Sequence, residues 1–194
     1  MSSIGMVCTG FSKPYVAIYG KSNNTITYSS GQRLARGVSV TASPETSDDN
    51  KFYADNIEAE NAVGKFTGGT LNITVDGLLS SAEQLIMGLP EADAQSLVHY
   101  DDDQVIPDCG VGFIGRYQSE GTVVYRAIIF PRVTFNLPEV SAATQEDAIE
   151  WQTQELTATI KRAEDAKRTW KYIGLNETSE AMAEQAIKNF FDIQ

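Results

Sequence analysis

Apolar and polar residues alternate along much of the chain, which is the period of a β-strand with one buried face and one wet face. The pattern is clearest over 71–76, where Leu, Ile and Val alternate with Asn, Thr and Asp, and it recurs over 38–42. A further strand is predicted over 13–19, with a turn at 23–24 after it. Most of the chain therefore has strand character.

A long hairpin is predicted over 112–136, with its turn at 118–121. Pro131 interrupts the second arm, and because proline has no backbone N–H to donate, we expect a bend, a bulge or an edge position there. Over 149–160 the apolar residues change phase between Thr153 and Leu156. One extra residue near Gln154 and Glu155 would repair the phase, so a bulge is predicted at that point.

Two short helices are expected beside the strands. The first spans about 80–88, where Ser80 to Glu83 spell a capping box and Gly88 gives a stop signal. The second spans about 178–191, with Thr178 or Ser179 as its cap. Its apolar residues form one stripe at helical spacing: Met182, Ala183, Ala186, Ile187 and Phe190.

These elements predict a mainly β (α+β) chain of one domain, 1–194, built as a β-sandwich or barrel with peripheral helices. An N-terminal arm (1–12) precedes the strands, and a C-terminal extension with the second helix (161–194) follows them. The polar stretch 43–56 is predicted to be a long loop between two strands, with an aromatic pair near its end. A loop of that length in a compact domain usually either has a function or is disordered.

Charge is unevenly distributed along this acidic chain, whose net charge is −11. Residues 1–44 contain four basic and no acidic residues, whereas 45–109 contain fourteen acidic residues and two lysines. The acidic middle argues against nucleic-acid binding by the chain as a whole. The basic start could contact the acidic middle of a neighbouring copy, or both regions could simply be solvated.

No motif gives a convincing catalytic, cofactor or metal site. Residues 110–115 spell GxGxxG, but a hairpin follows where a dinucleotide-binding turn needs a helix. The acidic run 101–103 lacks the spacing of a calcium loop. His99 is the sole histidine, and Cys8 and Cys109 read as reduced, structural thiols. We therefore expect a protein without enzymatic activity, cofactor or metal.

No signal peptide or membrane-spanning stretch is apparent, so we expect the chain to fold in the cytoplasm, without a membrane partner.

Five stretches, in this order along the chain, resemble the major tail proteins of long, non-contractile phage tails. They are GVSVTASPETSDDNKFYADN (37–56), GGTLNITVDGL (68–78), GFIGRY (112–117), YRAIIFPRVTF (125–135) and IEWQTQELTATI (149–160). The most specific feature is the polar loop ending in Tyr-Ala-Asp followed by the GGxLxIxVxGL strand. Together the stretches span most of the chain, from residue 37 to residue 160, in the family's order, and the part after Ile160 departs from the family pattern.

The resemblance implies a virion structural protein that forms homohexameric rings stacked into a tail tube, assembled in the host cytoplasm. Tape-measure, tail terminator and distal tail proteins would be its partners, and DNA would pass through the tube without specific binding. The implied assembly residues lie in the loop and the basic start: Asp48, Asp49, Lys51, Phe52, Tyr53, Asp55, Asn56, Lys13, Arg33 and Arg36. Side chains that could face the lumen are Asn72, Thr74, Asp76, Gln152 and Gln154.

Two other functions remain open on sequence alone. A carbohydrate-binding or receptor-binding β-sandwich module of a virion would expose an aromatic platform on a concave face. A small hydrolase on a β scaffold would depend on His99 as its histidine. Rings or tubes in the electron microscope would favour the tail-tube interpretation over both.

Overall fold

The computed structural model describes residues 5–140 and 152–194, apart from 24, 49, 55–56 and 63. In chain order the elements are β1 (Val7–Ser22), β2 (Thr25–Arg33), β3 (Gly37–Thr46), β4 (Asn50–Ala54), β5 (Ile57–Ala62), β6 (Phe66–Val75), α1 (Ser80–Met87), β7 (Asp108–Ser119), β8 (Thr122–Phe135), β9 (Gln154–Ile160), β10 (Tyr172–Ile173) and α2 (Glu180–Phe191). The protein is mainly β, as the sequence predicts.

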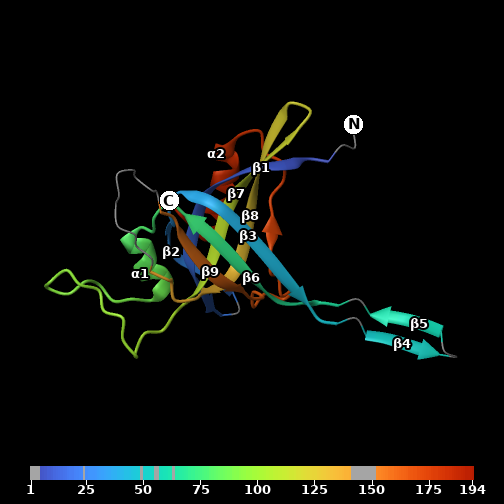
Figure 1. The fold of residues 1–194 in the computed structure, drawn as a ribbon, viewed down its shortest axis with the longest axis horizontal. Coiled ribbons are helices and arrows are strands. Elements are labelled where there is room, and N and C mark those ends of the chain that lie inside the picture. Colours follow the sequence, from blue (N-terminus) through green and yellow to red (C-terminus); the bar gives the residue numbers. More distant parts are fainter. Residues whose placement is uncertain (1–4, 24, 49, 55–56, 63, 141–151) are drawn as a thin grey trace.

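Eight of the strands form one antiparallel sheet in the order β2-β1-β7-β8-β9-β6-β3, with β10 added beside β8. The sheet curls, so that β3 comes back across β1 (Figure 1). The contact is close: Gly37 at the start of β3 lies directly against the Phe11 ring of β1, with no space for a Cβ between them. Curling lets the two halves of one sheet enclose a core.

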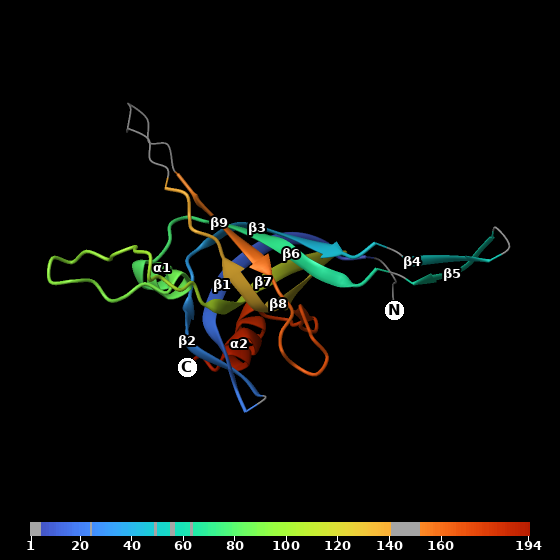
Figure 2. The same cartoon turned by 90° about the horizontal axis from the view of Figure 1, so that it is seen from below.

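Figure 2 shows three layers: β3, β6 and β9 on one side, β1, β7 and β8 in the middle, and α2 on the other side. The core between the two strand layers contains Leu71, Ile73 and Val75 of β6, and α1 covers one end of it with Ile86 and Met87. A second cluster lies between the middle layer and α2, where Ile187 and Phe191 are fully buried. Strand β7 is consequently buried on both faces over 109–115.

Both predicted helices form, and their ends follow local chemistry. Ser179 caps α2, because its hydroxyl accepts a hydrogen bond from the Met182 N–H at 3.3 Å. Gly88 ends α1 in the left-handed conformation, with φ 64°. The predicted capping box is wrong, because Leu79 occupies the N-cap position and no side chain caps α1. Ser80 is instead the first helical residue.

The hairpin over 112–136 is confirmed as β7 and β8, and so is the irregularity at Pro131. Cys109 pairs with Val133 whereas Val111 pairs with Phe130, so β8 holds one extra residue at this point. The bulge predicted near Gln154 is wrong, because β9 pairs with β6 without a register shift from Gln154 to Ile160. Residues 149 and 151, which suggested the bulge, lie outside the described part of the chain.

The loop predicted over 43–56 is replaced by a hairpin. β3 continues to Thr46, and beyond it β4 pairs with β5 as a separate two-stranded ladder. The Ser47 N–H donates to the Lys65 carbonyl at 2.9 Å between the two ladders. Backbone groups of a polar stretch need partners, and here β5, Lys65 and the start of β6 supply them. We call 47–65 the hairpin arm; it extends away from the body of the domain (Figure 1).

The predicted N-terminal arm is also shorter than expected. From Val7 onward the chain belongs to β1, where Val7 pairs with Gln118 and Ser12 with Ile114 of β7. The C-terminal extension packs on the body rather than leaving it, because β10 pairs with β8 and α2 covers the middle layer.

Candidate assembly surfaces

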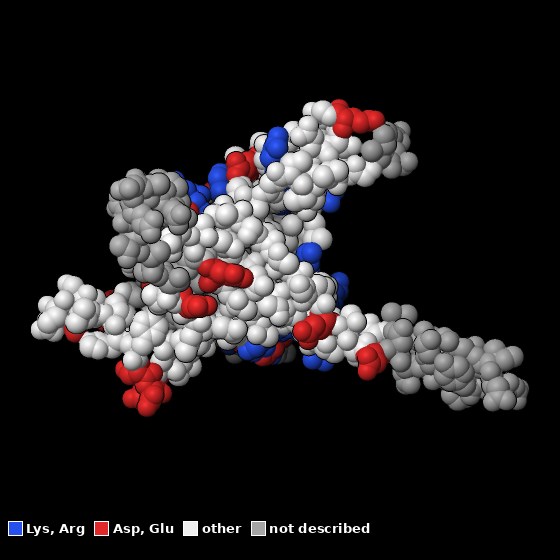
Figure 3. Space-filling model, viewed as in Figure 1, with Lys and Arg blue, Asp and Glu red and all other residues white. Residues whose placement is uncertain are grey.

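The outer side of β3, β6 and β9 carries small polar side chains in register across three neighbouring strands. Thr74 of β6 lies opposite Ser39 and Glu155, and Asn72 lies opposite Thr41 and Thr157. We call this surface the polar face; its residues are Ser39, Thr41, Ser43, Thr70, Asn72, Thr74, Glu155, Thr157 and Thr159. Figure 3 looks onto this side and shows mainly uncharged surface between separate charged side chains.

The predicted lumen residues divide between the two sides of the sheet. Asn72 and Thr74 belong to the polar face, and Asp76 follows them at the end of β6. Gln154 does not belong to it, because it pairs with Val75 and shares the inward phase of Leu156. Gln152 precedes β9. The alternation over 156–160 alone indicates the correct phase for Glu155, Thr157 and Thr159, which sequence reasoning did not select.

One member of the polar face has an unsatisfied atom. The Asn72 side-chain oxygen is shielded from solvent and has no hydrogen-bond partner among the described residues. A shielded acceptor without a donor costs about 1–3 kcal/mol. Asn72 therefore contributes less to the stability of the isolated subunit than an apolar residue of similar size would.

Both ends of the sheet have open edges. Among the described strands, β2 pairs only with β1, and β3 pairs only with β6. An open edge presents unpaired backbone donors and acceptors that a strand of another chain can satisfy. The polar face runs up to one of these edges, β3, and the hairpin arm leaves the body beside it.

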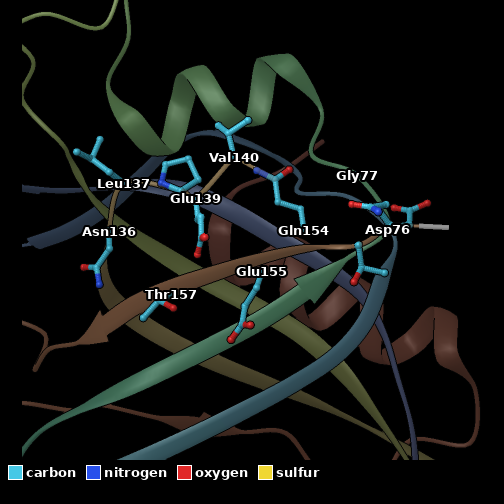
Figure 4. A pocket seen from close by; sticks show the side chains of 12 residues that line it. Asp76, Gly77, Asn136, Leu137, Glu139, Val140, Gln154, Glu155 and Thr157 are labelled. Atoms are coloured by element: carbon cyan, nitrogen blue, oxygen red, sulfur yellow. The ribbon is translucent and has the colours of Figure 1, made fainter. Parts of the chain in front are cut away.

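An acidic hollow of about 800 Å³ lies at one end of the polar face. Figure 4 shows side chains entering it from three places: Glu155 and Thr157 from β9, Asp76 from the end of β6, and Asn136 to Val140 from the segment after β8. Asp76 is paired with Arg36, and hydrogen bonds from Arg36 outweigh the opposing effect of desolvation and lower the pKa of the Asp76 carboxyl.

A basic hollow of about 430 Å³ lies at the opposite end of β6 and β9. Its lining comes from the start of β6, the end of β9 and the turn after it: Thr67, Gly68, Thr159, Ile160, Lys161, Arg162 and Arg168. The Lys161 ammonium lies 2.9 Å from Asp108. Neither Arg162 nor Arg168 has a carboxylate partner in the part of the chain that the structure describes.

The basic start of the chain is largely paired within the subunit. Lys13 lies 2.6 Å from Glu184 of α2, Lys21 lies 3.1 Å from Glu164, and Arg36 is paired with Asp76. Arg33 is the exposed exception, since its Nε donates only to the Ala35 carbonyl among the described residues. These ion pairs reduce the charge that Lys13 and Arg36 can offer to a neighbouring copy.

The other predicted assembly residues lie in the hairpin arm or beside it. Asp48 is exposed, and Lys51, Phe52 and Tyr53 belong to β4. Asp49, Asp55 and Asn56 lie outside the described residues. Whether this set contacts a neighbouring copy stays a prediction.

A charged network joins β7, β8 and the segment after β9. Asp108 accepts hydrogen bonds from Arg132 at 2.7 Å, from Lys161 at 2.9 Å and from the Thr134 hydroxyl. Arg132 also reaches Glu164 at 2.7 Å. Burial opposes ionisation of Asp108, but these hydrogen bonds outweigh it and lower its pKa. The network fixes the base of the basic hollow.

His99 and the acidic run 101–103, which the sequence offers as candidates for catalysis or metal binding, make contacts that stabilise loops. His99 Nε2 lies 2.8 Å from Asp93, whose carboxylate also accepts from the Leu97 and Gln95 N–H groups, so the pair fixes an exposed loop. Asp101 accepts from the Asp103 N–H at 3.1 Å in a tight turn. The described residues contain no group of three or more His, Cys, Asp or Glu side chains that could hold a metal ion.

No protein-family model matches the chain, and no curated protein is significantly similar to it. None of its helices, within the described residues, is long and apolar enough to span a membrane.

Proposed function

We propose that the protein is the structural subunit of a phage tail tube, which forms stacked hexameric rings around a channel for genome ejection. The observation that carries this proposal is the polar face, which continues in register over β9, β6 and β3 and ends at an open edge. A curled sheet with such a face and such an edge is suited to closing into a ring with copies of itself.

The chemistry of the polar face suits a channel wall. Serine, threonine and asparagine side chains hydrogen-bond to water and present no positive charge to DNA phosphates, so a passing genome does not adhere. Glu155 adds negative charge at one end. The unsatisfied Asn72 oxygen supports a function on this face, because the residue is present at a cost to the subunit.

The hairpin arm supplies a second means of contact between copies. It extends from the body as a two-stranded ladder whose strands pair with no other strand of the described chain. An isolated hairpin is marginally stable in water, so an arm of this kind gains order by packing on another surface. In the assembled tube that surface would belong to a neighbouring subunit.

The experiment is negative-stain electron microscopy and sedimentation of the concentrated protein, together with a Phe52→Ser, Tyr53→Ser variant and a His99→Ala variant. The wild type and His99→Ala should form rings or tubes. The arm variant should keep its circular dichroism spectrum but sediment as a monomer. A wild type that stays monomeric at every concentration and salt tested would contradict the proposal.

The alternative of a carbohydrate-binding module gains no support from the stacked pair of Phe66 and Trp170. Phe66 and Trp170 stack face to face at 4.4 Å and are half-buried, so each covers a face that a sugar ring would need.

A further inference from the structure

Charge reverses along the outer side of β9. Glu155, Thr157, Thr159 and Lys161 follow one another at alternate positions, which places them on the same side of the strand. Glu155 lies in the acidic hollow and Lys161 in the basic hollow. The two hollows therefore lie toward opposite ends of the same two strands, and Glu155 and Lys161 are separated by roughly 20 Å at the rise of a β-strand.

The acidic end of β9, at the acidic hollow, carries negative charge that is not neutralised within the described part of the subunit. Asp76 is neutralised by Arg36, but Glu139 and Glu155 are exposed and have no cationic partner among the described residues. Both line the same hollow, together with the polar residues Asn136 and Thr157. These two carboxylates line a concave surface rather than a flat one, so the hollow can receive a cationic side chain that projects from another molecule.

The basic end has a matching surplus. Lys161 is bound to Asp108, whereas Arg162 and Arg168 have no carboxylate partner in the described chain. Arg162 lies over the Phe66 ring at 5.8 Å. Glu45 lies opposite Gly68 and lowers the positive charge near the basic hollow. The unpaired positive charge at this end therefore belongs to Arg162 and Arg168.

The turn that presents Arg168 is held in place. Its Asp165 carboxylate accepts from the Thr169 N–H at 2.7 Å and from the Thr169 hydroxyl at 2.6 Å, and the Arg168 N–H donates to the Asp165 carbonyl at 3.1 Å. A pre-ordered cation loses less entropy on binding than a mobile one.

We propose that the basic end of one copy, through Arg162 and Arg168, docks onto the acidic end of a second copy, at Glu139 and Glu155. This inference rests on the proposed function and assigns the contact between successive rings. Because the two ends are different surfaces at opposite ends of β9, each copy can use both at once. Such a head-to-tail contact produces an open stack when the rotation between copies does not close into a ring. The hairpin arm leaves the body at the basic end, so both would meet the same neighbour.

The test is a charge-reversal series read by sedimentation and electron microscopy. Arg162→Glu with Arg168→Glu reverses the basic end, Glu139→Arg with Glu155→Arg reverses the acidic end, and a third protein combines all four. Each single-end variant should raise the critical concentration for tubes at least about tenfold, because like charges then meet. The four-fold variant should recover tubes. Glu91→Arg with Asp102→Arg, two exposed positions away from both hollows, is the matched control.

The outcomes separate this inference from the proposed function. Absence of rings and tubes from the wild type overturns the function itself. Normal tubes from both single-end variants, or no recovery in a four-fold variant that has native circular dichroism, overturn the stacking contact alone. If a reversal variant fails to fold, Arg162→Gln with Arg168→Gln replaces it, and it should remove most of the salt dependence of tube formation. Unchanged salt dependence would overturn the contact.

Discussion

Gly110 of β7 lies directly beneath the ring of Phe191 at the end of α2, and a Cβ on Gly110 would approach Phe191 Cε1 to 2.5 Å and Tyr28 Cε1 to 2.7 Å. Two residues along, a Cβ on Gly112 would lie 2.8 Å from Ile187 Cγ2. The absence of side chains at Gly110 and Gly112, two glycines of the GxGxxG motif, therefore lets the apolar side of α2 pack closely on β7. The motif has a steric cause unrelated to nucleotides.

Gly110→Ala should destabilise the subunit by about 1–3 kcal/mol, because the added methyl group overpacks a buried aromatic cluster. Urea unfolding followed by circular dichroism measures the change. Gly68→Ala is the matched control in another strand, since its Cβ would lie at 3.8 Å from the Ile160 carbonyl oxygen, an ordinary contact. Equal stability of the two variants would contradict the packing argument.

Glu184→Gln should weaken the attachment of α2 to β1. Burial acts to raise the pKa of Glu184, but hydrogen bonds from Lys13 and from the Tyr15 hydroxyl outweigh it, and the pKa is lowered. A lowered pKa gives stability that is present above the ordinary value of 4.5 and is lost as the pH falls through the folded value. We expect a loss of about 1–2 kcal/mol at pH 7 that shrinks at lower pH.

Alkaline pH should remove the contribution that the Tyr15 hydroxyl, which donates to Glu184, makes to the stability of the fold. Burial, followed by the hydrogen bond to Glu184, raises the pKa of Tyr15 to about 12. A raised pKa contributes stability that is complete below the ordinary value of 10 and is lost between 10 and 12. Tyr15→Phe should therefore flatten the alkaline limb of the stability profile, measured by unfolding between pH 8 and 12. A limb as steep as that of the wild type would refute the assignment.

The two cysteines should react at very different rates. Cys8 is exposed, whereas Cys109 is fully buried, and burial followed by the nearby Asp108 charge raises the pKa of its thiol to about 12. The thiolate is the reactive form. A chromogenic disulfide reagent at pH 8 should titrate one thiol in the folded protein and two in urea, and Cys8→Ser should abolish the fast reaction. Two fast equivalents in the folded state would show that Cys109 is accessible.

Asn72→Val should raise the free energy of unfolding by about 0.5–1 kcal/mol, since it removes an acceptor without a donor and adds a β-branched residue to a strand. Thr70→Val, on the same face of β6, is the control without an unsatisfied buried atom. If Asn72→Val is destabilising, the Asn72 oxygen has a hydrogen-bond partner in solution. Asn72 would then carry no cost to the subunit and would give no support to a function of the polar face.

The sequence by itself determined both helices and the strands that have one buried side, because burial on one side leaves a period that can be read directly. The alternation over 71–76 predicts β6, and Thr178 or Ser179 is predicted as the cap of α2. Pro131 predicts a bend, a bulge or an edge position, and the structure has a bulge there. Each of these depends on residues a few positions apart in the chain.

Tertiary structure decided which residues meet across long separations. Lys13 is paired with Glu184, and Arg36 is paired with Asp76. The basic residues of 1–44, which the sequence left free to contact a neighbouring copy, are therefore mostly paired within the subunit. The phase of β9 followed from pairing with β6, which placed Glu155 rather than Gln154 on the polar face. The predicted loop became strands because 43–46 paired with 66–70 and 50–54 paired with 57–62. Pairing energy between distant segments leaves no local periodic signal, so only the folded chain reveals it.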